Sequence, residues 1–116
     1  MLARQNRLRS ASDIARVYKR GSYGGSGGTL SAKMAPSGRR VSRIVVVVGK
    51  KVSKRAVVRN RIRRRLIGSL ASHWATVTPG YDIVVSVHAD ISELPAAALE
   101  DHLTRALTRA AGNTKS

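Results

Sequence analysis

Residues 50–65 are the stretch of the chain whose side chains could do the most chemistry. Nine of these sixteen residues are Lys or Arg and none is acidic, in the segment KKVSKRAVVRNRIRRR. Guanidinium groups donate paired hydrogen bonds to phosphate oxygens, and like charges at this density repel one another unless an anion lies between them. Blocks of like charge are often disordered tails, but Val57, Val58 and Ile62 interleave this one with apolar residues. The stretch therefore predicts a folded surface that binds a polyanion.

Groups that could carry hydrolysis by themselves are scarce in this chain. The three histidines, His73, His88 and His102, lie far apart without the spacing of metal ligands. No pair of the six acids has a spacing that suggests a two-metal nuclease site. The absence of Cys excludes disulfides and thiolate metal sites. We expect no catalytic residue and no metal site here, so an enzyme that contained this chain would take its reactive centre from another component.

The charge is unevenly distributed along the sequence. The formal net charge is +16, and residues 1–81 hold 19 Lys or Arg and a single acid, Asp13. Residues 82–116 hold three basic residues and five acids. A strongly positive field speeds association with nucleic acid and makes the affinity depend on salt. The first part of the chain is therefore expected to meet the partner, while the C-terminal segment acts as scaffold.

Two other polyanion partners fit the sequence less well than RNA. A membrane-surface helix needs a broad face of bulky apolar residues, whereas the first half of the basic segment is basic on most sides. DNA recognition by a helix-turn-helix would need a second helix directly before it, and strand patterns flank the segment instead. The longest apolar run, 44–48, is too short to span a bilayer, and no signal peptide is recognisable. We expect a cytoplasmic protein with no membrane partner and no DNA partner.

Local patterns predict the elements that hold the basic stretch in place. Ser10 and Asp13 have the spacing of a capping box, which predicts a helix over residues 11–20. Before it, residues 1–9 are expected to form a basic arm with little structure. The patterns after it predict a mobile glycine loop over 22–28, a half-buried strand over 29–35 and a very apolar, central strand over 43–49, the two strands forming an antiparallel hairpin.

The basic segment itself is predicted to be a helix over residues 53–73, capped by Ser53. On a helical wheel, its buried stripe consists of Ile62, Leu66, Leu70 and Trp74. Arg59 and Arg63 fall within the same angular range, and unpaired arginines cannot enter a dry core. The first half of the helix is therefore expected to overhang a wet groove.

A buried strand over 82–88 and a last helix, from 92–95 to Gly112, complete the pattern. Residues 113–116 are expected to fray. The expected fold is a single RNA-binding domain over residues 1–116, an α/β (α+β) sandwich in which helices cover a small mixed sheet. The expected order is α-β-β-α-β-α, with a possible extra short strand before the basic helix.

The basic segment also resembles a known signature. Residues 50–66, with the triplet Arg59, Asn60 and Arg61 after Lys50 and Lys51, are similar to the signature of the protein subunit of bacterial ribonuclease P. Residues 6–21 resemble the N-terminal helix of that family, residues 43–48 resemble its central strand, and the closing strand and helix fall in the family order. The resemblance covers about 100 residues.

The resemblance implies a ribonucleoprotein endoribonuclease that removes the 5′ leader from precursor tRNA. In that family a large catalytic RNA holds the magnesium ions that carry hydrolysis, and a left-handed β-α-β crossover surrounds the basic helix. The alternatives from other classes are a ribosomal or chaperone-like RNA-binding protein and a nucleoid-type DNA binder. The partners that the resemblance implies are the catalytic RNA subunit and precursor tRNA. No cofactor is expected to bind the protein alone.

The resemblance also assigns residues. The expected contacts to RNA are Lys50, Lys51, Lys54, Arg55, Arg59, Asn60, Arg61, Arg63, Arg64 and Arg65. The expected cleft for the single-stranded leader contains Arg7, Arg9, Ile14 and Tyr18. The family usually has aromatic residues at the positions of Ile14 and Tyr18, so Ile14 departs from its pattern.

Overall fold

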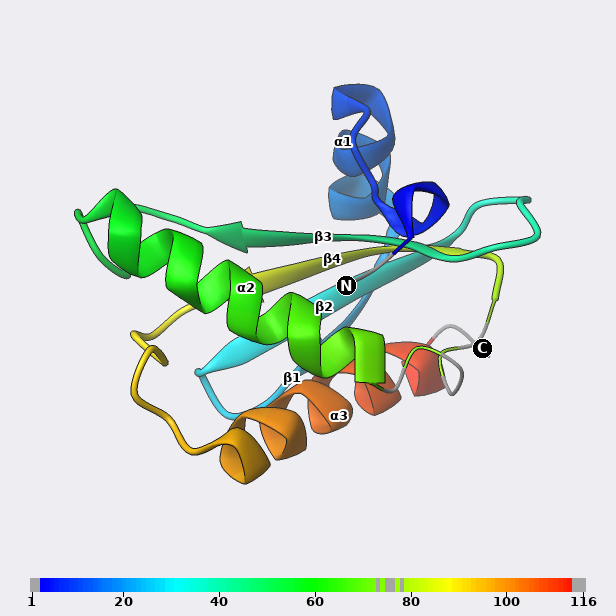
Figure 1. Ribbon diagram of the computed structural model, residues 1–116. Helices are drawn as coiled ribbons and strands as arrows, with labels where there is room; N and C mark the ends of the chain where they lie inside the picture. Colours follow the sequence, from blue (N-terminus) through cyan, green and yellow to red (C-terminus); the bar gives the residue numbers. More distant parts are fainter. Residues whose placement is uncertain (1–2, 73, 75–76, 78, 114–116) are drawn as a thin grey trace.

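Three α-helices surround one four-stranded sheet in the computed structural model, which describes residues 3–72, 74, 77 and 79–113 (Figure 1). In chain order the elements are η1 (Arg4–Asn6), α1 (Ala11–Arg20), β1 (Ser22–Gly25), β2 (Leu30–Pro36), β3 (Arg43–Val48), α2 (Ala56–Ser72), β4 (Tyr81–Val87) and α3 (Ala96–Asn113). The strands lie in the order β1-β2-β4-β3. Because β4 pairs antiparallel with β2 and parallel with β3, the sheet is mixed, as predicted.

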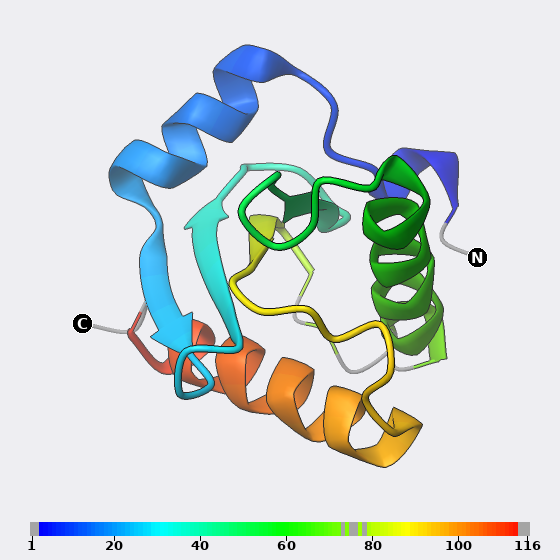
Figure 2. The same cartoon turned by 90° about the vertical axis from the view of Figure 1, so that its left-hand side faces the viewer.

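Alternate residues of the strands point into two different cores. On one face, Ile83 and Val85 belong to the main core, which α2 and α3 cover. On the other face, Val84 and Ala35 pack with Val17 of α1 in a smaller core. Figure 2 shows α1 on one side of the sheet and the two longer helices around the other. The predicted sandwich of a sheet between helices is confirmed.

The predicted hairpin between the strands over 29–35 and 43–49 is wrong, because β4 lies between β2 and β3. β3 is therefore an edge strand, although its apolar sequence predicted a central one. Its edge is partly covered, since Arg7 forms a parallel bridge with Ile44 and the Leu8 N–H donates to the Ile44 carbonyl at 2.9 Å. The β3–α2–β4 unit joins two parallel neighbours. Its left-handedness stays a prediction.

The predicted glycine loop over 22–28 is wrong in its first half, which forms strand β1 and pairs with β2. Gly24 lies against α3, where an added Cβ would come within 2.3 Å of the Ala106 carbonyl oxygen and the Ala110 nitrogen. This glycine therefore permits a close approach of strand to helix rather than motion. The extra short strand that the sequence left possible is β1, although it lies at the far edge of the sheet from the basic helix.

The helix ends in the structure agree with the prediction for α1 and differ from it for α2. Ser10 caps α1 as predicted, because its hydroxyl accepts the Asp13 N–H at 3.4 Å. The basic helix begins at Ala56 instead of Ser53, since the Ser53 hydroxyl accepts the Arg55 N–H and forms a turn before the helix. The last helix begins at Ala96 and runs to Asn113; the frayed tail predicted after it lies mostly outside the described residues, as does residue 73.

The predicted unstructured arm over 1–9 is also wrong for the residues that the structure describes. Arg4–Asn6 form the 3₁₀ helix η1, Leu8 is buried in the smaller core, and the Asn6 amide donates to the Ser42 carbonyl at 2.9 Å. The buried apolar side chain and the hydrogen bond outweigh the low structural propensity of the basic sequence.

Candidate nucleic-acid interface

The basic face of α2 is held in place by the opposite side of the same helix. Ile62, Leu66 and Leu70 are fully buried in the main core, as the helical stripe predicted. This packing turns Arg61 and Arg64 outward, where both side chains are exposed. The apolar stripe therefore fixes the direction in which the arginines point.

The loop before α2 concentrates further positive charge at the start of the helix. The Ser53 carbonyl accepts the Arg59 Nη1 donor at 2.9 Å, which ties the loop to the helix. Beside this tie, four exposed cations lie together in sequence: Lys50, Lys51, Lys54 and Arg55. No acid occupies the first turn of α2, so the positive end of the helix dipole adds to their charge. This end of the molecule can bind several phosphates.

Arg59 and Arg63 avoid the dry core, as predicted from their positions on the helical wheel. Both side chains are half-buried, and each has a polar partner: Arg59 binds the Ser53 carbonyl, and Arg63 donates to the Asn60 Oδ1. The Asn60 side chain itself remains exposed beside them. Residues 59–63 thus combine two structural hydrogen bonds with the exposed polar side chains of Asn60 and Arg61.

Arg65 has a structural task that the sequence did not predict. Its Nη1 donates to the carbonyls of Ile91 at 2.7 Å and Ser92 at 3.0 Å, and its Nη2 donates to the Leu94 carbonyl. These bonds hold the loop between β4 and α3 against α2. Because both terminal nitrogens are engaged, Arg65 is a weaker candidate for phosphate binding than its neighbour Arg64.

Replacing Arg65 with Ala should therefore reduce the stability of the fold clearly and the affinity for RNA only slightly. The free energy of unfolding is expected to fall by about 2 kcal/mol, because hydrogen bonds from a charged donor to three carbonyls are removed. The matched control is Arg64→Ala, which is expected to change stability by no more than about 0.5 kcal/mol. Urea unfolding measures both, and equal losses in the two variants would contradict the structural role of Arg65.

Acidic residues mark one border of the basic face. The Glu93 carboxylate lies 3.9 Å from the Arg61 guanidinium, with both side chains exposed. Nearby, hydrogen bonds from Ser92 lower the pKa of the Asp90 carboxyl, and the charge of Arg61 lowers it further. An RNA backbone is expected to avoid this border, because two carboxylates stand beside it.

The predicted leader-cleft residues lie around α1 and do not form one continuous set. Arg7 and Arg9 are exposed on the chain before the helix. Ile14 packs against the smaller core, whereas Tyr18 is 43% exposed. The Lys33 ammonium donates to the Tyr18 carbonyl at 2.8 Å and lies 6.0 Å from the centre of its ring.

Three residues outside the predicted leader cleft lie on the same face of the sheet as α1. Tyr23 of β1 pairs in register with Lys33 of β2, and Lys33 pairs with Val84, which belongs to the core under α1. Tyr23 is 55% exposed, and Val47 of β3 is exposed on this face as well. The alternation within 29–35 already placed Lys33 on the wetter side of its strand. Tyr23 is an aromatic residue near the basic arm, but it was left out of the predicted cleft because it was assigned to a glycine loop.

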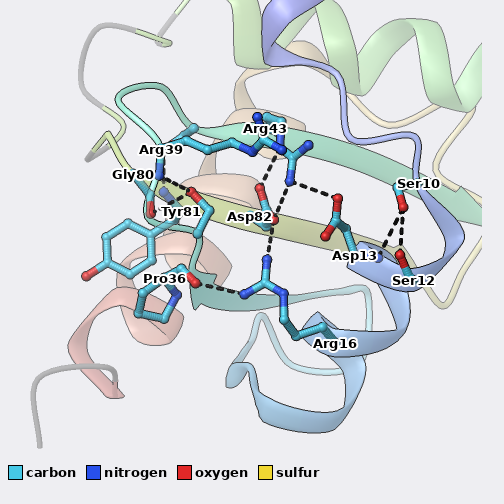
Figure 3. A network of polar contacts seen from close by, with 12 residues as sticks. Ser10, Ser12, Asp13, Arg16, Pro36, Arg39, Arg43, Gly80, Tyr81 and Asp82 are labelled. Carbon is cyan, nitrogen blue, oxygen red and sulfur yellow. Dashed lines mark hydrogen bonds and ion pairs between the residues drawn. The ribbon is translucent and has the colours of Figure 1, made fainter.

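A buried ion network anchors α1 to the sheet (Figure 3). Asp82 of β4 is fully buried; its carboxylate accepts from the Arg16 Nη2 at 2.5 Å and from the Arg43 Nε and Nη2 at 2.8 and 2.7 Å. Arg43 also reaches Asp13 of α1 at 3.2 Å. The hydrogen bond with Asp82 raises the pKa of Arg43, against the lowering effect of burial. Asp13 and Asp82 therefore neutralise the two arginines that join α1 to the sheet.

A basic face on α2 beside a sheet face with exposed tyrosines is typical of a nucleic-acid-binding protein. The family model described as Ribonuclease P matches residues 2–111. The chain is 40% identical over 112 residues to the ribonuclease P protein component of Pseudanabaena sp., covering 95% of each sequence. It is 33% identical over 110 residues to that of Clavibacter michiganensis, covering 95% of this chain and 96% of the relative.

A solved structure agrees with this match at the level of the fold. The RNase P protein from Thermotoga maritima superposes with a TM-score of 0.78 at 23% identity, covering 89% of this chain and 96% of that chain. The chain belongs to the ribonuclease P protein component family. Within the described residues, none of the helices combines the length and the apolarity needed to cross a membrane.

Proposed function

We propose that this chain is the protein subunit of a ribonucleoprotein endoribonuclease that removes the 5′ leader from precursor tRNA. The observation that carries the proposal is the outward basic face of α2, where Lys54, Arg61 and Arg64 are exposed. Of these three, only Arg61 has an acidic partner among the described residues, at the long distance of 3.9 Å. Family membership supports the choice of this ribonucleoprotein over a ribosomal or chaperone-like protein.

The proposed division of labour gives hydrolysis to a large partner RNA. In the part of the chain that the structure describes, no group of three His, Cys, Asp or Glu side chains is arranged to hold a metal ion. The carboxylates of Asp13 and Asp82 bind arginines instead. These carboxylates, already paired with arginines, do not fit the magnesium ions of the reaction, which we propose are held by the RNA.

The assembly is proposed to act in the cytoplasm.

The proposed path of the single-stranded leader is the sheet face beside α1. The exposed rings of Tyr18 and Tyr23 can stack on unpaired bases, and the Lys33 ammonium near Tyr18 can meet a phosphate. Ile14 is proposed to support this face from below, because it packs into the smaller core instead of facing solvent as an exposed side chain. Arg7 and Arg9 supply charge before the helix.

Cleavage of precursor tRNA tests the proposal. At low magnesium, the cognate catalytic RNA is expected to cleave the substrate much faster with this protein than without it, because the basic face offsets phosphate repulsion. The protein alone, after nuclease treatment, is expected to be inactive. Absence of stimulation would reject the proposed assembly, and cleavage by the nuclease-treated protein would reject the assignment of catalysis to RNA.

A further inference from the structure

A small cavity lies at the opposite end of the sheet from the basic start of α2. It has a volume of about 230 Å³ and lies between the residues before β3, the residues before β4 and the N-terminal 3₁₀ helix. Its lining includes Asn6, Arg40, Val41, Ser42, Trp74 and Pro79. The residues just before β3 and just before β4 lie close together, since the Ser37 N–H donates to the Gly80 carbonyl at 2.8 Å. Since α2 has 17 residues, it is about 25 Å long, and the cavity lies beyond its far end from the basic start.

The cavity is lined by two polar residues with fixed hydrogen bonds and by one aromatic residue. The Asn6 amide donates to the Ser42 carbonyl, and the Ser42 hydroxyl accepts the Tyr81 N–H at 3.0 Å, so both polar residues are buried and fixed by the sheet. Trp74 packs against the main core but is only half-buried. The single Trp of the chain thus lines a small hollow next to fixed amide and hydroxyl groups.

The charge around the cavity selects an anionic ligand. Arg40 lines the opening with an exposed side chain that has no hydrogen bond or ion pair with any residue the structure describes. The arm beside it carries Arg4 and Arg7, both exposed. A guanidinium binds phosphate oxygens, and an indole stacks on bases. Arg40 next to Trp74 therefore suits a ligand in which a planar ring is joined to a phosphate. The volume lies below the range of about 300–1,000 Å³ for drug-sized ligands, so one base fits better than a base pair.

We propose that this cavity binds the base of one unpaired RNA nucleotide, with Trp74 stacking on the base and Arg40 binding its phosphate. This site is separate from the basic face of α2 and goes beyond the proposed role of that face. It gives the protein a second point of contact with RNA, at a fixed distance from the first.

The fluorescence of Trp74 tests the site directly, because no other Trp contributes. A single-stranded RNA hexamer is expected to quench this fluorescence saturably in the full chain. A hexamer of the same charge without bases is expected to bind without quenching. Arg40→Ala should raise the Kd measured by quenching about tenfold, the effect expected for removing one charged hydrogen bond. Arg39→Ala removes the same charge from an exposed neighbour outside the lining and should raise the Kd less than about threefold.

Three results would overturn the inference. They are equal quenching by the hexamer without bases, equal effects of the Arg39 and Arg40 variants, and loss of quenching when Arg61 and Arg64 are both replaced by Ala. The last result would place the signal at α2. Quenching that persists in a protein that fails to stimulate cleavage would leave the cavity site standing while rejecting the proposed function, so the two failures are distinguishable.

Discussion

Replacing Asp82 with Ala should lower the free energy of unfolding by about 3–5 kcal/mol, the largest stability loss expected for a single side chain on the α1 side of the sheet. The Asp82 side chain is fully buried and accepts three hydrogen bonds from Arg16 and Arg43. Arginine stays protonated, so the variant leaves the Arg43 charge, 13% exposed, with Asp13 as its only carboxylate partner among the described residues.

The matched control for this change is Asp101→Ala. Asp101 also pairs with an arginine, Arg105, but both side chains are about half exposed on α3. Exposed pairs of this kind contribute about 0.3–0.5 kcal/mol, so stability should hardly change. Urea unfolding followed by circular dichroism compares the variants. If Asp82→Ala costs no more than Asp101→Ala, α1 is not anchored by the buried network.

Replacing Arg61 and Arg64 together with Ala should cause the largest loss of RNA affinity expected here. Each phosphate that no longer binds an arginine reduces the slope of log K against log salt by about 0.7–0.9, so the slope of the double variant should fall by about 1.4–1.8. Both side chains are exposed, and neither donates a hydrogen bond within the described residues, so the fold should persist.

The double variant Arg105→Ala and Arg109→Ala is the control, because it removes the same charge from the exposed face of α3. Its salt slope should stay close to that of the unchanged protein. Binding to the catalytic RNA is measured by filter retention over a range of salt concentrations. Equal slopes for the two double variants would mean that net charge, rather than the α2 face, determines RNA binding.

The elements with strong local signals were predicted correctly from the sequence. Ser10 and Asp13 define the start of α1, and the spacing of Ile62, Leu66 and Leu70 defines the buried side of α2. The exposed basic face follows from that stripe, because a helix that buries one side must present the other. These features depend on residues less than ten positions apart.

The features that were missed depend on contacts between distant residues. The insertion of β4 between β2 and β3 cannot be inferred from the turn after Pro36, because that turn is also compatible with a hairpin. The role of Asp82 depends on arginines 39 and 66 positions away, and the role of Arg65 depends on carbonyls of the loop after β4. Gly24 appeared to be a loop residue from the sequence. The reason for a glycine at this position is the close contact of β1 with α3, which leaves no room for a Cβ.

The maximal rate of precursor cleavage at saturating protein tests most directly whether α2 is a docking surface rather than an active site. Single-turnover cleavage with the catalytic RNA is measured over a range of protein concentrations, for the unchanged chain and for the Arg61 and Arg64 double variant. We expect the variant to need a higher protein concentration but to reach the same maximal rate. A lower maximal rate at an unchanged half-saturating concentration would contradict this expectation.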